Sequence, residues 1–343
     1  MNRRRWLAAT ALIACTLATL GCRDHDARPT VVLYYSADDH IARPIIQAFE
    51  EQTGIDVRER GDTEANKTTG LVEKLRAERN RPRADVFWSS EVFLTTRLAD
   101  EDILAPCHTA VTDAWPDAWT GREHRWHGFA CRARVVVYNT ERVAPGDVPR
   151  TMHDLLNPKF RDRVVMARPQ FGTTRGHMAM LVNLWGPERT EAFLMQLADN
   201  GVRLVDGNST VVRMVARGEA WVGLTDTDDV IGGQRNDWPV EASLVRHDVD
   251  DLTIGPMVIP NTVALVNGAP HPEPARQLID FLLSARVEEM LAESDSRNIP
   301  VRPDLAARLD TWDISDPAPI DYHDVAASMH TAMQLCDRIL AGR

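Results

Sequence analysis

Short apolar runs that end in polar residues recur along the chain and predict the strands of an α/β protein. Strands are expected at 31–35, 55–58, 85–88, 164–166, 202–205 and 221–224. Segments with helical spacing of apolar residues are expected at 43–52, 71–78, 174–184, 188–199, 211–217, 273–283, 287–293 and 321–340. Strands that alternate with helices in this way are typical of a mostly parallel sheet flanked by helices.

Two longer apolar runs are interpreted as strands that cross between two such units. The first, 132–138, reads Arg-Ala-Arg-Val-Val-Val-Tyr and leaves the first unit, and the second, 258–265, returns to it. The length of 343 residues is enough for two ordinary domains. We therefore expect one lobe from 31–135 with 262–343, and a second lobe from 136–261.

Four polar turns adjoin short apolar runs and are expected to meet around one small ligand, because ligands of open α/β sheets bind beyond the carboxyl ends of the strands. The most acidic turn follows the strand at 221–224 and contains Asp226, Asp228 and Asp229. The other turns contribute hydroxyl and amide groups, from Thr68, Thr69, Thr173, Thr174, Asn208, Ser209 and Thr210. The alternative is that these residues are ordinary turn residues and helix caps.

Carboxylates and an anion-binding turn together define the expected chemistry of this site. Asp38, Glu91, Asp226 and Asp228 offer hard oxygen donors, which suit a hard cation or an ammonium group. Carboxylates packed together raise one another's pKa, so the cluster requires a positive partner. The turn at 171–175 would aim backbone N–H groups and hydroxyls from a helix start, which suits an anion. A zwitterion, or a metal ion with a co-anion, would interact with both the carboxylates and the anion-binding turn.

The histidines give no comparable indication of a metal site. His40, His127 and His177 are candidate ligands, but no two of them have a spacing typical of a metal site, such as four residues apart on a helix. We therefore expect a structural role for each.

The N-terminus is typical of an exported protein. Basic residues at 3–5 precede an apolar segment at 6–20 and then Gly21 and Cys22. The small residue before Cys22 resembles the lipobox of bacterial lipoproteins, so residues 1–21 are interpreted as a signal peptide. Lipidation at Cys22 and a polar tether at 22–30 would then anchor the protein to a membrane on the periplasmic side. Ordinary cleavage nearby is the alternative.

Export also bears on the remaining cysteines. An oxidising compartment would allow a disulfide between Cys107 and Cys131. Cys336 lies on an apolar helical face and is expected to be a buried free thiol.

Composition and missing motifs exclude several classes of protein. The net charge of −11 would repel phosphate backbones, so nucleic acid is not expected as a partner. The sequence contains no Walker A loop, dinucleotide fingerprint, HExxH motif or Gly-x-Ser-x-Gly elbow. We therefore expect a binding protein and not an enzyme.

Several segments together resemble the bacterial extracellular solute-binding proteins of ABC importers, in the branch of the ferric-ion-binding periplasmic proteins. The resemblance covers about residues 30–310, and the segments that carry it are 32–36, 49–55, 84–88, 133–139 and 279–284. It implies the two-lobed type II periplasmic binding protein fold, which closes on its ligand like a hinged trap. It also implies a monomer that delivers its ligand to an ABC permease in the inner membrane.

The same resemblance implies an iron(III) site, from which this chain departs. Ferric members hold iron with a histidine or tyrosine near the first strand end, a carboxylate after the third strand and a tyrosine pair in the second lobe. These positions fall near Asp38, at Ser90 or Glu91, and near 227–229, where no tyrosine stands. The resemblance makes iron(III) with a co-anion the leading candidate ligand, and an aminoalkylphosphonate or other small zwitterion is the alternative. A sensor that presents its ligand to a receptor is the alternative of another class.

Overall fold

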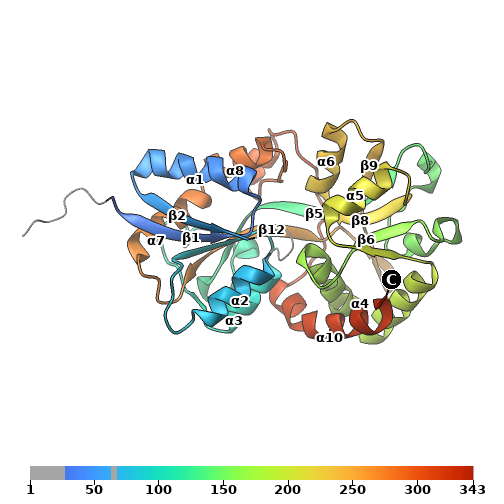
Figure 1. The fold of residues 1–343 in the computed structure, drawn as a ribbon, viewed down its shortest axis with the longest axis horizontal. Helices are drawn as coiled ribbons and strands as arrows, with labels where there is room; N and C mark the ends of the chain where they lie inside the picture. The colour runs from blue at the N-terminus through green and yellow to red at the C-terminus, as the bar shows by residue number, and fades with distance from the viewer. Residues whose placement is uncertain (1–27, 63–67, 343) are drawn as a thin grey trace, which may run out of the picture.

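The structure is a computed structural model that describes residues 28–62 and 68–342. The predicted signal peptide and the lipidation at Cys22 lie outside these residues and stay predictions. Two lobes stand side by side, and two long strands run between them (Figure 1). In the described residues, no helix is long and apolar enough to cross a membrane.

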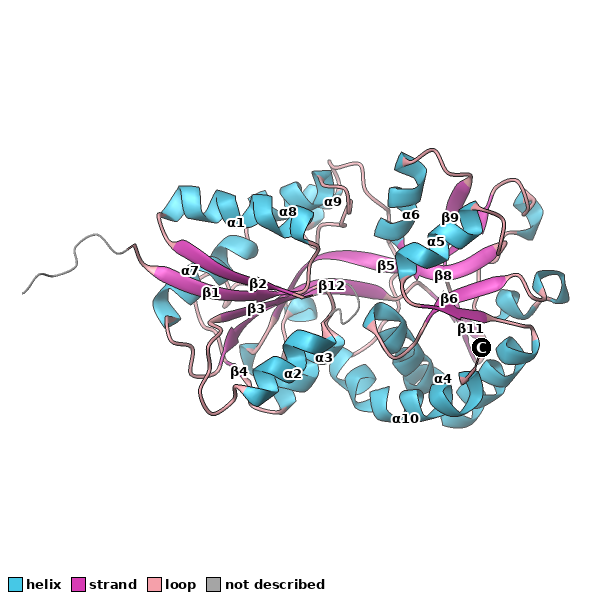
Figure 2. Cartoon of the chain, viewed as in Figure 1, coloured by secondary structure: helices cyan, strands magenta, loops and turns pink. Residues whose placement is uncertain are grey.

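The first lobe is a sheet covered by helices on both faces (Figure 2). Its strands and helices are β1 (Thr30–Tyr35), α1 (Asp39–Thr53), β2 (Asp56–Gly61), α2 (Thr69–Ala77), β3 (Val86–Ser89), α3 (Phe93–Asp100), β4 (Leu104–Ala105), α7 (Pro272–Leu282), α8 (Ala285–Glu293) and α9 (Pro303–Ala306). β1 pairs in parallel with β2 and β3, as the alternating pattern predicts. α1 and α7 pack on one face, where the Phe49 and Phe281 rings lie 5.5 Å apart.

The crossing strands are β5 (His127–Asn139) and β12 (Val258–Val266), which confirms both predicted crossings. Residues 127–133 of β5 pair with β12, and residues 134–139 pair with strands of the second lobe. Almost every residue of the two strands is buried. β5 begins five residues before the predicted run, because His127, Gly128 and the residues that follow pair with β12 despite weak strand propensity.

The second lobe repeats the layered arrangement. Its strands and helices are β6 (Val164–Ala167), α4 (Gly172–Asp199), β7 (Arg203–Val205), α5 (Asn208–Ala216), β8 (Val222–Asp226), α6 (Thr227–Arg235), β9 (Val240–Leu244), β10 (His247–Val249) and β11 (Leu252–Ile254). β6 pairs in parallel with β7 and β8. The two helices predicted at 174–184 and 188–199 form the single element α4, which is kinked at Gly186, where φ is 78° and Pro187 follows.

Short 3-10 helices connect these elements, and a long helix closes the chain. They are η2 (Asp117–Trp119), η3 (Arg122–His124), η4 (Pro145–Asp147), η5 (His153–Leu156), η6 (Pro158–Phe160) and α10 (Tyr322–Leu340). α10 packs mainly along α4 and also contacts α3. We predicted that residues up to 343 belong to the first lobe, but α10 lies on the second, because its apolar face matches that of α4.

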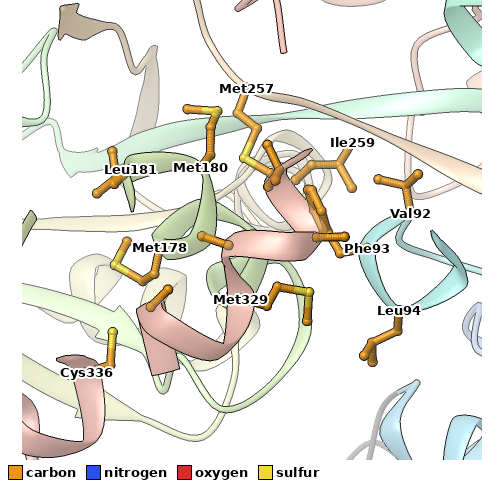
Figure 3. Packing of buried hydrophobic residues seen from close by; sticks show 14 of the residues in the cluster. Val92, Phe93, Leu94, Met178, Met180, Leu181, Met257, Ile259, Met329 and Cys336 are labelled. Atoms are coloured by element: carbon orange, nitrogen blue, oxygen red, sulfur yellow. The ribbon is translucent and has the colours of Figure 1, made fainter. Parts of the chain in front are cut away.

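A continuous apolar core follows from this placement of α10. Figure 3 shows Phe93 of α3, Met178 of α4 and Met329 of α10 within one buried cluster. Gly176 makes the close approach between the lobes possible, since a Cβ there would lie 2.1 Å from the Phe93 ring. The two lobes are therefore in apolar contact on this face.

The cysteine prediction was wrong. Cys107 and Cys131 are both free and buried, and they belong to different apolar clusters. Cys336 is a buried free thiol in the α4–α10 core, as expected.

Candidate functional site

A cavity of about 120 Å³ lies where the two lobes meet. It is smaller than the roughly 300–1,000 Å³ of pockets for drug-sized ligands, so it suits a ligand of few heavy atoms. Its walls come from both lobes and from β5. The lining residues are Asp38, Thr68, Ser90, Glu91, Arg132, Ala167, Arg168, Phe171, Gly172, Thr173, Thr174, Asp206, Gly207, Asn208, Ser209, Asp226, Asp228 and Asp229.

The structure brings together most of the predicted site residues. Of the eleven, nine line the cavity: Asp38, Thr68, Glu91, Thr173, Thr174, Asn208, Ser209, Asp226 and Asp228. Thr69 and Thr210 do not line it. The Thr210 hydroxyl instead accepts a hydrogen bond of 2.9 Å from Arg213 on the surface of α5. The convergence follows from topology, because the turns after the strands of each sheet open toward the other lobe.

Asp226 is the most densely bonded side chain of the site. It ends β8 with 1% of its surface exposed. Arg134 Nη1 donates to Asp226 Oδ1 at 2.7 Å, and Arg132 Nε donates to Oδ2 at 3.1 Å. The Thr173 hydroxyl and the Asn208 amide also donate to Oδ2, at 2.6 and 3.0 Å. Both carboxylate oxygens are therefore already bonded by the protein.

The ionisation of Asp226 reflects these partners. Burial raises the pKa of Asp226, but Arg134 and Arg132 outweigh burial, so the pKa lies below its ordinary value. Burial lowers the pKa of Arg132, but the nearby carboxylates of Asp228 and Asp226 raise it by more than burial lowers it, so the guanidinium stays charged. The two arginines are the positive partner that the carboxylates require. Asp226, one of the expected metal ligands, is thus part of a buried ion-pair network.

Several polar atoms beside this network have no hydrogen-bond partner among the described residues. They are Thr174 Oγ1, Asn208 Oδ1 and Arg134 Nη2. Thr174 is 1% exposed and lines the cavity. Thr173 differs from it, because its hydroxyl donates to Asp226 and accepts from Arg134 and Asn208. Buried polar atoms are normally paired, so those of Thr174 and Asn208 indicate a site for a ligand.

Helices α4, α5 and α6 of the second lobe all begin at the cavity wall, at Gly172, Asn208 and Thr227. Their N-cap residues are Phe171, Gly207 and Asp226, and none of these caps its helix through its side chain in the described structure. Of the helices that begin elsewhere, α8 and α10 are capped by Ser284 and Asp321, whereas α7 and α9 also lack a side-chain cap. Uncapped N-termini present N–H donors and positive dipole ends, which favour an anion. At α6 the carboxylates of Asp226, Asp228 and Asp229 oppose an anion, so this argument applies to α4 and α5.

Glu91 has a structural role in addition to its place in the wall. Its carboxylate accepts from the backbone N–H groups of Phe93, at 2.7 Å, and Leu94, at 3.2 Å, at the start of α3. Burial raises the pKa of Glu91, although these two hydrogen bonds and the nearby arginines act in the opposite direction. The sequence pattern did not predict α3, so this capping role was missed.

On the first-lobe side, hydroxyls form a chain at the cavity wall. Thr68 donates to the Ser36 hydroxyl at 3.1 Å, and Ser36 and Ser90 lie 3.2 Å apart, oxygen to oxygen. Asp38 is exposed at the start of α1. This wall therefore offers hydroxyls and the Asp38 carboxylate to a ligand, beside the Glu91 carboxylate that caps α3.

The remaining carboxylates form a compact group. Oxygen atoms of Asp226, Asp228 and Asp229 all lie within 4.8 Å of one another. Arg132 Nε is 3.9 Å from Asp228 Oδ2, and the Thr225 hydroxyl donates to Asp229 at 3.1 Å. All four tyrosines of the chain lie in the described residues, and none of them lines the cavity. No phenolate is therefore available to a metal ion there.

Two buried histidines support the network from behind. Arg134 Nε donates to His177 Nδ1 at 3.3 Å, and His177 Nε2 lies 2.8 Å from His247 Nε2. Burial lowers the pKa of His177 well below its ordinary value and lowers that of His247 to about 4. His177 therefore has the expected structural role, and His40 lies exposed on α1.

These histidines give an expected pH dependence of stability. Burial also lowers the pKa of His127 to about 4. Each of the three histidines takes up a proton on unfolding below pH 6.5, so acid favours the unfolded chain by about 1.4 kcal/mol per pH unit per histidine. The free energy of unfolding, measured in urea with a chelator present, should therefore fall between pH 7 and pH 5.

A matched variant tests this cause. Both ring nitrogens of His127 are without partners in the described residues, so His127→Leu removes no hydrogen bond. In this variant, the fall in the free energy of unfolding between pH 7 and pH 5 should be smaller by the contribution of one histidine. Equal unfolding free energies at both pH values in the unsubstituted protein would contradict the expectation.

Sequence reasoning missed the two arginines that organise the site. Arg132 and Arg134 lie in the run 132–138, which was interpreted only as a crossing strand. Their alternation, Arg-Ala-Arg, places both side chains on the same side of β5, opposite Asp226 of β8. Two charges on one face of an otherwise apolar strand indicated a buried partner of opposite charge.

Known proteins share this architecture. An iron uptake protein of Synechocystis is 26% identical over 77% of this chain and 73% of its own length. A Salmonella typhi protein named "Putative 2-aminoethylphosphonate-binding periplasmic protein" is 28% identical over 82% of this chain and 76% of its own. The structure of iron-bound HitA from Pseudomonas aeruginosa superimposes with a TM-score of 0.77 at 23% identity, over 90% of this chain and 99% of that protein.

The fold of that structure is therefore the fold of this chain, a two-lobed type II periplasmic binding protein. The family model described as "Bacterial extracellular solute-binding protein" matches residues 31–294, which is more than half of the chain. The protein belongs to the bacterial extracellular solute-binding proteins.

Proposed function

We propose that the protein binds a small zwitterion with a phosphonate or phosphate group between its lobes and delivers it to an ABC permease. The observation that carries this proposal is the cavity wall formed by the uncapped N-termini of α4 and α5. A tetrahedral anion has several oxygens and can accept from more than one helix N-terminus at once.

The anion would lie next to Thr174 and Arg132. The Thr174 hydroxyl has no partner within the described ranges, so it is available to donate to an oxyanion. The Arg132 guanidinium lines the cavity and is held in place through Nε by Asp226. A charged donor fixed in this way loses little entropy when it binds an anion.

The amino group would lie next to the carboxylates. Asp38, Asp228 and Asp229 line this cavity and also the adjoining one. The anion donors therefore lie on one part of the cavity wall, and the acidic groups lie on another part. The relative from Salmonella typhi, named for 2-aminoethylphosphonate, makes that compound the first ligand to test.

Calorimetric titration of the purified protein with 2-aminoethylphosphonate tests the proposal. We expect one molecule bound per chain, and weaker binding of ethylphosphonate, which lacks the amine, and of ethanolamine, which lacks the anion. Absence of binding by every phosphonate and phosphate monoester tried would overturn the proposal.

Replacement of Thr174 tests the position of the anion. Thr174→Val is expected to weaken phosphonate binding about 10-fold or more, since a hydrogen bond to a charged group contributes about 1.5–3 kcal/mol. Stability should not fall, because the lost hydroxyl has no partner in the described structure. Thr190→Val is the control on the same helix, where the hydroxyl donates to the Gly186 carbonyl away from the cavity. Equal affinities of the Thr174 variant and the unsubstituted protein would remove Thr174 from the site.

Iron(III) with a co-anion is the second candidate, and the group of Asp226, Asp228 and Asp229 favours it. The Synechocystis relative is named for iron uptake. Native mass spectrometry after addition of iron(III) and carbonate distinguishes the two candidate ligands. An adduct of one iron ion would indicate that carboxylates of this chain replace the tyrosine ligands of the ferric members. A sensor role would share either ligand and would lack a permease partner.

The place of action follows from the predicted signal peptide and from Cys22. We infer a monomer on the periplasmic side, tethered to a membrane through lipid on Cys22. Membrane association of the full chain that is lost in Cys22→Ser would support the anchor.

A further inference from the structure

A group of three histidines and one aspartate lies in the first lobe, apart from the cavity between the lobes. His108 and Asp113 belong to the loop after β4, His124 ends η3, and His127 begins β5. Donor atoms of His108, Asp113 and His124 all lie within 4.8 Å of one another. None of the four residues lines the cavity described above.

The loops that carry these residues are fixed to each other and to the lobe. The Cys107 N–H donates to the His124 carbonyl at 3.0 Å, which joins the two loops. The Thr109 hydroxyl donates to Asp280 of α7 at 2.6 Å. His108 Nδ1 lies 2.8 Å from Asp113 Oδ1. The side chains therefore converge on a supported scaffold, which a metal site requires.

His127 is the observation that points to a ligand. It is 0% exposed, and neither ring nitrogen has a hydrogen-bond partner in the described residues. His124 Nδ1 is likewise buried and without a partner there. The rings of His127 and His124 have centroids 5.8 Å apart, and those of His124 and His108 4.9 Å apart. Buried nitrogens without partners are rare, and a bound ion would account for both residues.

The protonation of the group suits a metal ion. Burial, together with the nearby His124 and His108, lowers the pKa of His127 to about 4, so the ring is neutral at pH 7 with a free lone pair. Burial raises the pKa of the neighbouring Cys107 to about 11. That thiol stays protonated and is not counted as a ligand.

We propose that His108, Asp113, His124 and His127 bind one divalent transition-metal ion of the zinc class, independently of the ligand between the lobes. Imidazole nitrogens with a single carboxylate suit zinc and its neighbours, while magnesium and calcium prefer oxygen donors. The donor atoms within 4.8 Å of one another are those of His108, Asp113 and His124, so the His127 ring, whose centroid lies 5.8 Å from that of His124, would shift toward the ion on binding. The His108 and Asp113 side chains are 59% and 55% exposed, so they are able to rotate onto the ion.

Zinc titration of the chelator-treated full chain, followed by calorimetry, tests this site. We expect one zinc ion per chain and a higher melting temperature with zinc, because an ion bound only by the folded state stabilises it. His108→Ala should weaken zinc binding about 10-fold or more, since loss of even a supporting partner costs roughly 10- to 100-fold. Cobalt(II) should give visible absorption bands that His127→Leu alters.

Controls separate this site from the carboxylates between the lobes. His330→Ala removes an exposed histidine on α10 and should leave zinc affinity unchanged. His108 is exposed, so its variant should keep the melting temperature of the metal-free protein. The inference is overturned if no zinc binds, or if His108→Ala and His127→Leu bind zinc as tightly as the unsubstituted chain.

Discussion

Asp226→Ala is expected to destabilise the protein by about 3–5 kcal/mol, because removal of one member of a buried ion pair leaves the other charge uncompensated. Arg134 is 0% exposed and Arg132 8% exposed, so both guanidinium groups stay largely removed from water in the folded state. The Thr173 hydroxyl would lose its acceptor at the same time, and the Asn208 amide would lose one of its two acceptors. Urea unfolding at pH 7 measures the effect as a lower midpoint.

The control for this variant lies at the rim of the same cavity. Asp206→Ala removes a carboxylate whose side chain is 94% exposed and which pairs with Arg168 at 3.3 Å. An exposed ion pair contributes about 0–1 kcal/mol, so this variant should be nearly as stable as the unsubstituted chain. Lost ligand binding with unchanged stability in Asp226→Ala would show that Asp226 is a ligand residue and not an anchor.

The sign of the pH effect at Asp226 follows from its lowered pKa. The contribution of the ionised carboxylate is present above the pKa of the unfolded chain and is lost as pH falls through the lower pKa of the folded state. Asp226→Ala should therefore differ most from the unsubstituted protein near neutral pH and least in strong acid.

The fold was predictable where periodicity and turns agree. The run 31–35 is apolar throughout, and 258–265 is mostly apolar, and short runs of this kind between polar turns favour buried strands. The pattern failed at α3, since Phe93–Asp100 follows β3 after a short link and mixes buried threonines with apolar residues. The pattern also did not predict on which lobe α10 packs. An amphipathic helix shows that one of its faces is buried, but it does not show which element covers that face.

The position of the site was predictable, but its charge state was not. Topology alone brings strand-end turns together, so nine of the eleven residues reached one cavity. Whether a carboxylate is free or paired depends on side chains distant in sequence: Arg134 and Asp226 are 92 residues apart. The histidine group was missed for the same reason, because His108, His124 and His127 converge through loop packing and not through helical spacing.

Arg132→Gln distinguishes the two candidate ligands by the sign of its effect. For a phosphonate or phosphate, the loss of a buried charged donor should weaken binding about 10- to 100-fold, since such a hydrogen bond contributes about 1.5–3 kcal/mol. For iron(III), the same change removes a positive charge next to Asp226 and Asp228, 3.1 and 3.9 Å from Arg132 Nε, and should strengthen binding.

The control for Arg132 is Arg168→Gln at the cavity rim, where the side chain is 43% exposed. Solvent screens that charge, so we expect an effect below about 5-fold on either ligand. Titrations of both variants with 2-aminoethylphosphonate and with iron(III) plus carbonate complete the test. Weaker phosphonate binding confined to the Arg132 variant would place the anion against β5. A gain in iron affinity in the Arg132 variant, with no phosphonate binding by the unsubstituted protein or by either variant, would instead assign the carboxylate group to the metal. Only a cation binds more tightly when the positive charge of Arg132 is removed.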